Sequence, residues 1–199
     1  MSNNHDILAE KFDEVWRLLK SEGVRGSVIV AAAIHDDILK QILSAHLVPC
    51  NDKADYLFDG PNAPIGTMAA RIDLAYRTAR ISSQLRQSLH IVRKLRNDFA
   101  HLSSPIDFDD TSVRDRTKHL LDLNRSFIEL IWLKFRPVIF EAAGVIGSPD
   151  IYKDDVVTDM LEYSGYRQTF EIWASAVAGG LAEIYAETES LKEYKGKPK

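Results

Sequence analysis

Apolar residues recur every three or four positions along most of this chain, a spacing that places them on one face of an α-helix. The first run predicts an amphipathic helix over about residues 6–20, and the second predicts a helix over about residues 27–47. The first half of the second helix reads VIVAAAI and is apolar on every side. Such a helix is buried on most of its surface, so we expect it to be the central helix of the fold.

Turn-forming residues separate these helices from the next ones. Residues 48–65 are rich in Pro, Gly, Asn and Asp and predict a long loop. Helical spacing returns in a third helix over about residues 68–79 and in a fourth that ends near His101. Ser82 or Ser83 can cap the fourth helix, because a serine hydroxyl accepts a hydrogen bond from a free backbone N–H of the first turn.

The second half of the chain also has helical spacing. A fifth helix, capped within residues 110–112, either breaks near Leu123 or continues through Phe135. Pro137 should kink it, because proline lacks the amide donor that an interior position needs.

A last helix follows near the C-terminus. A short segment at about residues 156–163 precedes a helix over about residues 166–188, and residues 191–199 are polar and predict a flexible tail. The 10 Gly and 7 Pro among 199 residues leave few turn formers for a β-sandwich or barrel. The sequence therefore predicts an all-α helical bundle, folded as a single domain over residues 1–190.

Cysteine content and hydropathy exclude several classes of protein. A single cysteine, Cys50, excludes a disulfide framework and a multi-cysteine zinc site, and we expect neither a metal nor a cofactor. The N-terminal segment does not have the pattern of a secretory signal. The longest near-continuous apolar run, Val28–Ile34, is shorter than the roughly 20 residues that a spanning helix needs. We expect a cytoplasmic protein with no membrane segment.

Residues 71–101 concentrate the positive charge of an otherwise acidic chain. This stretch holds seven Lys and Arg and two Asp, a formal charge of +5; the chain has a net charge of −4, so the remainder carries −9. A phosphate-bearing partner such as RNA would bind there, although a solvated helix face would carry the same charges. The candidate RNA-binding residues are Arg93, His90, Arg86 and Lys94.

Arg96 and His101 do not share a face of an ideal helix. His101 lies with Asn97 in a polar stripe, whereas Arg96 projects about 140° away, near the apolar face. We therefore expect Arg96 to be partly buried and paired with an acid, because an unpaired buried guanidinium is costly. For Arg96 and His101 to meet at one phosphate, the helix must end before His101 or a second protomer must supply the other half. The candidate acidic partners are Asp36, Asp37 and Asp73.

The end of the fourth helix carries a family resemblance. Arg96-Asn97-x-x-x-His101 resembles the Arg-Asn-x-x-x-His motif of the HEPN (higher eukaryote and prokaryote nucleotide-binding) superfamily. The segment DGPNAPIGTMAARIDLAYRTARIS followed by IVRKLRNDFAHL is similar to the mannitol operon repressor family, a branch of that superfamily. The resemblance covers about residues 20–140, which leaves a C-terminal helical extension at about residues 150–190 outside it.

The resemblance implies a HEPN-like bundle that forms a homodimer, with the motif helices facing each other across the two-fold axis. In nuclease members the motif Arg and His cut RNA without metal, which implies a metal-independent endoribonuclease with Arg96 and His101 catalytic and Asn97 assisting. Histidine can carry the proton and arginine can stabilise charge on the phosphorane. In the mannitol repressor branch the assigned role is transcriptional, so the alternative is a non-enzymatic regulator or corepressor that acts through protein contacts. A third possibility is a toxin controlled by an antitoxin partner.

Each candidate also has a purely structural interpretation. His101 fits a role in capping the last carbonyls of the helix, and Arg96 fits one half of a buried ion pair. His35 with Asp36 and Asp37 suggests a metal ligand set, but no second His stands at ligand spacing, so a helix turn in which one acid pairs with Arg96 is favoured. Three tryptophans are expected in the core or at an interface: Trp16, Trp132 and Trp173.

Overall fold

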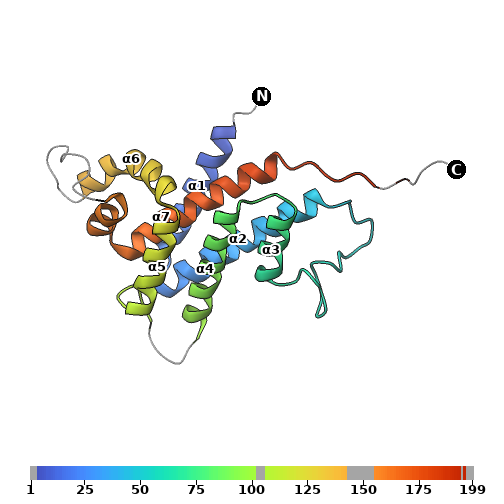
Figure 1. Ribbon diagram of the computed structural model, residues 1–199, viewed down its shortest axis with the longest axis horizontal. Coiled ribbons are helices and arrows are strands. Elements are labelled where there is room, and N and C mark those ends of the chain that lie inside the picture. The colour runs from blue at the N-terminus through green and yellow to red at the C-terminus, as the bar shows by residue number, and fades with distance from the viewer. Residues whose placement is uncertain (1–3, 102–105, 143–154, 194, 196–199) are drawn as a thin grey trace.

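The fold consists of helices throughout the described part of the chain (Figure 1). The computed structural model describes residues 4–101, 106–142, 155–193 and 195. These residues form seven helices and no strand, which confirms the predicted all-α class. The helices are α1 (Asn4–Ser21), α2 (Val24–His46), α3 (Met68–Arg77), α4 (Ser83–Ala100), α5 (Thr111–Leu123), α6 (Arg125–Ala142) and α7 (Val156–Ala186).

Capping side chains fix where α3 and α4 begin. Of the two candidate caps of α4 the structure uses Ser82, whose Oγ accepts a hydrogen bond from the backbone N–H of Leu85 at 3.1 Å. Thr67 caps α3 in the same way, with its Oγ1 3.2 Å from the N–H of Ala70. Ala79 has a positive φ of 57° just after α3, in the short turn that leads to α4.

A buried asparagine separates α5 from α6, so of the two possibilities in the sequence the break near residue 123 is confirmed. Asn124 donates from Nδ2 to the carbonyl of Leu120 at 2.7 Å and to Oγ of Ser88 on α4 at 2.8 Å. These two hydrogen bonds attach the turn between α5 and α6 to α4 and to the end of α5. They also satisfy the buried amide group, which needs hydrogen-bond partners. Helix α6 continues past Pro137 to Ala142, and the predicted kink at Pro137 stays a prediction.

A glycine divides α7 into two parts. Gly165 has φ 69° and ψ 169°, a conformation that costs glycine little because it has no Cβ. The short segment and the last helix predicted from the sequence correspond to the residues on either side of it. Thr169, at the start of the second part, donates from Oγ1 to the carbonyl of Gly165 at 2.7 Å and so stabilises the first turn after the break.

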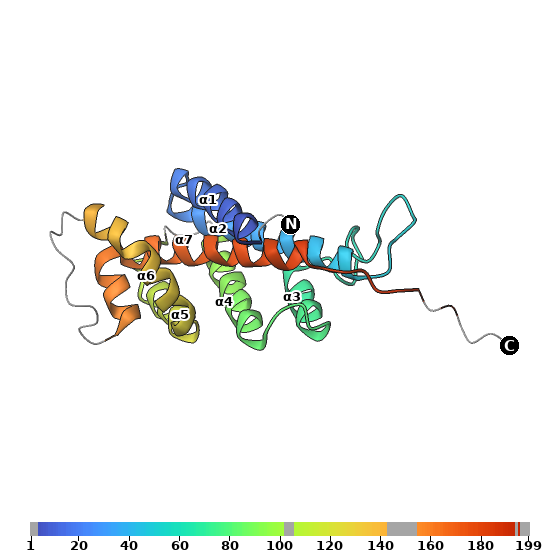
Figure 2. The ribbon, with the colours of Figure 1, turned by 90° about the horizontal axis from the view of Figure 1, so that it is seen from above.

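Helices α2 and α7 share the centre of the bundle. Helix α2 contacts α1, α3, α4 and α7, and α7 contacts α1, α2, α5 and α6. In Figure 2, α7 runs lengthwise, with α1 on one side and α4 and α5 on the other. The prediction that α2 is central is confirmed, but α7 is equally central, because most of its residues from Thr169 to Leu181 are buried.

The junction of α2 and α7 contains a buried histidine. His35 is fully buried and donates from Nε2 to the carbonyl of Ala174 at 2.9 Å. Its ring meets that of Trp173 edge-on, with centroids 6.1 Å apart. Burial lowers the pKa of His35 from 6.5 to about 4, although the hydrogen bond to Ala174 opposes the shift. Trp173 and Trp132 are buried and Trp16 is half-buried, so the expectation that the tryptophans pack in the core is confirmed.

Helices α1 and α7 approach each other closely at a glycine. A Cβ on Gly179 would lie 2.7 Å from the carbonyl oxygen of Leu8, so only glycine fits without a shift of the backbone. Beyond α7, the backbone N–H of Leu191 donates to the carbonyl of His46 at 2.8 Å, which joins the start of the polar tail to the end of α2. No described helix is both long enough and apolar enough to cross a membrane.

Candidate functional site

Helix α4 ends one residue before His101. His101 is the C-cap in an extended conformation, with φ −71° and ψ 118°, and its side chain is exposed. Its backbone N–H donates to the carbonyl of Asp98 at 3.3 Å, and its carbonyl accepts from Nη2 of Arg25 at 3.4 Å. The first of the two geometric possibilities therefore holds within one chain: the helix ends before His101. His101 therefore caps α4 through its backbone N–H, and among the described residues its imidazole forms no hydrogen bond to a carbonyl.

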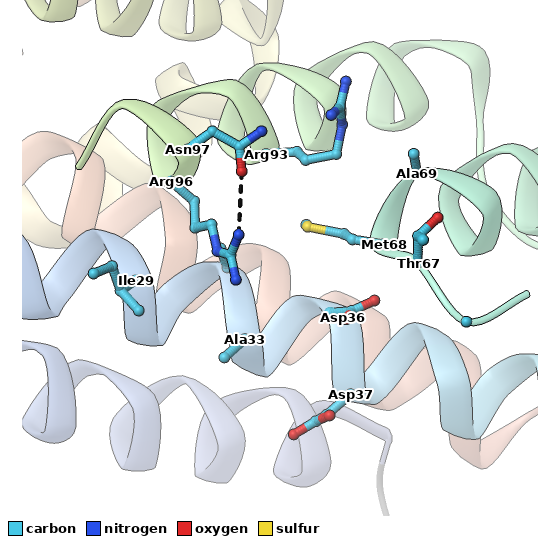
Figure 3. Close-up of a pocket in the computed structure, with 12 residues that line it drawn as sticks. Ile29, Ala33, Asp36, Asp37, Thr67, Met68, Ala69, Arg93, Arg96 and Asn97 are labelled. Carbon is cyan, nitrogen blue, oxygen red and sulfur yellow. Dashed lines mark hydrogen bonds between the residues drawn. The ribbon is translucent and has the colours of Figure 1, made fainter. Parts of the chain in front are cut away.

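Arg96 is exposed, which corrects the expectation that it is partly buried. Its Nη1 donates to Oδ1 of Asn97 at 3.2 Å. In Figure 3 the guanidinium extends from α4 toward α2 beside Ala33. The physical reason is that small side chains on α2 leave a cavity at this level of the α2–α4 junction instead of a packed interface.

Asp36 pairs with an arginine other than Arg96. Arg71 at the start of α3 donates from Nη1 to Oδ2 of Asp36 at 2.8 Å, and from Nε to the carbonyl of Ile65 at 3.1 Å. Burial raises the pKa of Asp36, against the hydrogen bond and charge of Arg71 and the weaker effect of Arg96. Arg71 also lies on the apolar face of α3 with Met68 and Ala75. This position in the sequence indicates that the Arg71 side chain is buried and needs an acidic partner.

The other two acids predicted to pair with Arg96 do not do so either. Asp73 accepts from Nε of Arg86 at 2.7 Å and from Nε2 of His90 at 3.2 Å, and these hydrogen bonds lower its pKa. Asp37 is exposed and extends from the side of α2 away from α4 (Figure 3). Within the described residues no acid forms an ion pair with Arg96, because Asp36 and Asp73 face closer cations.

The positive charge of residues 71–101 is therefore partly neutralised. Arg86 is held by Asp73 and lies over the ring of Tyr76, with 5.1 Å from the guanidinium carbon to the ring centroid. His90 is half-buried against the same carboxylate. Of the four candidate RNA-binding residues, Lys94 is exposed and Arg93 is half-buried beside the cavity.

A cavity of about 430 Å³ lies between α2, the start of α3 and α4 (Figure 3). It brings together five of the predicted residues: Arg93, Arg96 and Asn97 from α4, and Asp36 and Asp37 from α2. The remaining walls were not predicted from the sequence because they come from separate segments. These residues are Ile29, Ala32, Ala33, Gly66, Thr67, Met68 and Ala69.

An ion pair ties the motif helix to α5. Asp98, inside the Arg-Asn-x-x-x-His stretch, accepts a hydrogen bond from Nη1 of Arg116. The ion pair with Arg116 on α5 and the hydrogen bond from Arg25 on α2 attach the end of α4 to two neighbouring helices. Arg116 was not predicted from the sequence, since nothing in the local pattern of α5 distinguishes it from other surface cations.

The described residues contain no group of three or more His, Cys, Asp or Glu arranged to hold a metal ion. His35 and the two acids after it are separated by burial, because His35 points into the core toward Ala174.

Comparisons with protein-family models, with curated proteins and with solved structures found no match. The resemblance to the HEPN superfamily and to the mannitol operon repressor family stays a prediction.

Proposed function

We propose that this protein is a cytoplasmic RNA-binding protein of the HEPN type that cleaves RNA without a metal ion. The observation that supports it most strongly is the state of two side chains at one helix end. Arg96 is exposed beside a cavity, with its guanidinium bonded to Asn97 and to no acid among the described residues, and His101 is exposed just past the helix. Both are therefore accessible to a phosphodiester.

The proposed reaction needs only these groups and the RNA. The 2′-hydroxyl attacks the adjacent phosphorus, the bond from phosphorus to the 5′-oxygen breaks, and the products are a 2′,3′-cyclic phosphate and a 5′-hydroxyl. His101 transfers the proton, a role that histidine side chains commonly have in general acid–base catalysis. Arg96 stabilises negative charge on the phosphorane through its planar set of donors, and Asn97 holds Arg96 in place. Lys94 and Arg93 contact flanking phosphates.

We also propose that the active form is a homodimer, in which the α4 ends of two chains face each other. Light scattering after gel filtration should then give twice the 22.5 kDa mass of one chain. A strictly monomeric protein that cleaves RNA would contradict the dimer without affecting the proposed chemistry.

Cleavage assays test the nuclease directly. The purified protein should cut total RNA in the presence of EDTA, and Arg96→Ala or His101→Ala should each lower the rate by about a hundredfold or more. Arg17→Ala and His119→Ala are matched controls, since both residues are exposed on other helices. Overproduction should slow growth unless Arg96 or His101 is replaced. Uncut RNA with wild-type protein, with and without metal, would overturn the proposal.

A second candidate is the non-enzymatic regulator that acts through protein contacts. Binding of an antitoxin-like partner would likewise need a surface for protein contacts on this chain. The observation that favours it is the exposed apolar surface of α6, where Leu130 and Leu133 are 67% and 48% exposed. A regulator predicts neither RNA cleavage nor toxicity, and replacement of both leucines by polar residues would abolish partner binding.

A further inference from the structure

We propose that a groove along α7 binds a small amphipathic amine, a molecule with an apolar body and a protonated amino group. The groove lies between α7, the first half of α1, the start of α4 and the junction of α5 and α6, and its volume is about 380 Å³. Small-molecule sites in proteins commonly have volumes of roughly 300–1,000 Å³. The proposal goes beyond the proposed function, because it involves neither RNA nor a dimer.

The walls of this groove are mainly apolar. Leu85, Phe127 and Ile184 are half-buried, so part of each side chain still faces water. An apolar ligand would remove this surface from water, and the free energy gained is roughly proportional to the area covered. The remaining apolar walls are Leu8, Ala176, Val177, Gly180 and Leu181.

Gly180 marks the open part of the groove. A Cβ on Gly180 would have no heavy atom of the described chain within 4 Å, whereas a Cβ on Gly179 would lie 2.7 Å from the carbonyl oxygen of Leu8. Helix α1 therefore packs tightly against α7 at Gly179 and leaves the space above Gly180 unfilled. The apolar body of a ligand fits in this space.

Two polar side chains at the groove have free hydrogen-bond acceptors. Glu183 is half-buried, and its carboxylate forms no ion pair with a described residue. Gln84 donates from Nε2 to the carbonyl of Leu123 at 2.8 Å, and its Oε1 accepts no hydrogen bond within the described chain. A charged acceptor beside an apolar groove favours a cation that carries N–H donors, because such hydrogen bonds are stronger than neutral ones.

An amine matches these acceptors better than other small amphipathic molecules do. A fatty acid would place a second carboxylate beside Glu183, and like charges repel each other. An alcohol would donate one hydrogen bond without a charge, which is a weaker interaction. An alkylammonium group, with a pKa of about 10.4 like that of lysine, is charged at neutral pH and carries three N–H donors.

The groove is separate from the cavity beside Arg96, and the two have no wall residue in common. Leu85 is in the first turn of α4, whereas Arg96 lies roughly 16 Å further along the helix axis. Amine binding can therefore be measured independently of RNA binding and cleavage. Failure of the nuclease would leave this proposal unaffected, and failure of this proposal would leave the nuclease unaffected.

Calorimetric titration of the full-length protein with decylamine, 1-decanol and decanoate tests the choice of ligand. Decylamine should bind about tenfold more tightly than decanol, and decanoate should bind more weakly than both. Between hexylamine and decylamine, each added methylene should tighten binding by about two- to fourfold. Glu183→Gln should make decylamine and decanol bind alike. The control Glu162→Gln, exposed on the first part of α7, should keep the preference for the amine.

Gly180→Leu tests where the apolar body binds. The leucine side chain would fill the space above Gly180, so decylamine should bind about tenfold more weakly or worse. If this variant does not fold, the comparison of Glu183→Gln with Glu162→Gln decides.

Three results would overturn the proposal. They are no binding of decylamine at about 1 mM, equal binding of decylamine and decanoate, and an unchanged amine preference in Glu183→Gln. If no amine binds and Gly180→Leu converts a dimer into a monomer in light scattering, the groove is instead covered by a second copy of the chain.

Discussion

Arg71 donates a hydrogen bond from Nη1 to Oδ2 of Asp36 at 2.8 Å, and this ion pair joins the start of α3 to α2. The side chain of Arg71 is 9% exposed and that of Asp36 is 25% exposed, so the pair is largely removed from water. The same arginine holds the carbonyl of Ile65, one residue before Gly66 in the wall of the cavity. Stability and the shape of the candidate site therefore depend on the same side chain.

Arg71→Met should lower the free energy of unfolding by about 3 kcal/mol, because it leaves a buried carboxylate without its cation. Urea denaturation measures the change. The matched control is Lys40→Met, which removes a more exposed pair with Asp59 at 2.7 Å and should cost less than about 1 kcal/mol. Equal effects of the two substitutions would contradict the assignment of Arg71 as a buried structural residue.

The stability of the fold should decrease in mild acid because of His35. Its pKa is about 4 in the folded chain and 6.5 in the reference state, so between these values the unfolded chain binds more protons. The free energy of unfolding should therefore fall by about 3 kcal/mol as the pH drops through that interval.

His35→Gln should remove this part of the pH dependence, since glutamine does not titrate. Urea denaturation across the same pH interval tests it, with the exposed His119→Gln as the control that keeps the wild-type slope. An unchanged slope in His35→Gln would show that other groups cause the loss of stability.

Two adjacent glycines on α7 should respond in opposite directions to alanine. Gly179→Ala places a Cβ 2.7 Å from the carbonyl oxygen of Leu8 and should destabilise the protein by about 1 to 3 kcal/mol, because α1 and α7 must separate. Gly180 has no heavy atom within 4 Å of a Cβ, so Gly180→Ala should stabilise the helix by about 0.5 to 1 kcal/mol. Thermal unfolding of the two variants should show shifts of opposite sign.

Ser82 and Ser83 provide a further matched pair. Ser82→Ala removes the hydroxyl that accepts from the N–H of Leu85 and should cost about 1 kcal/mol. Ser83→Ala removes an exposed hydroxyl within the first turn and should change stability by less than about 0.5 kcal/mol. A larger loss for Ser83→Ala, measured by urea denaturation, would show that α4 begins one residue later.

Much of the secondary structure could be predicted because its causes are local. Periodic apolar positions predicted the helices, and the pattern also indicated two segments on either side of Gly165. The sequence left the cap of α4 open between Ser82 and Ser83, since both are chemically suited, and only the backbone geometry selects Ser82. The centrality of α7 was not predicted, because periodicity does not show which helices a face packs against.

The sequence by itself determined the all-α class, the approximate helix positions apart from the break between α5 and α6, and the concentration of Arg and His near the end of α4. Only the tertiary structure decided that Arg71, not Arg96, pairs with Asp36, that Asp73 neutralises Arg86 and His90, and that a cavity opens beside Arg96. The physical reason is the separation along the sequence between the residues that determine each feature. Helix formation and capping depend on residues within one or two turns, whereas ion pairs and cavities depend on which distant side chains the packing of three helices brings together.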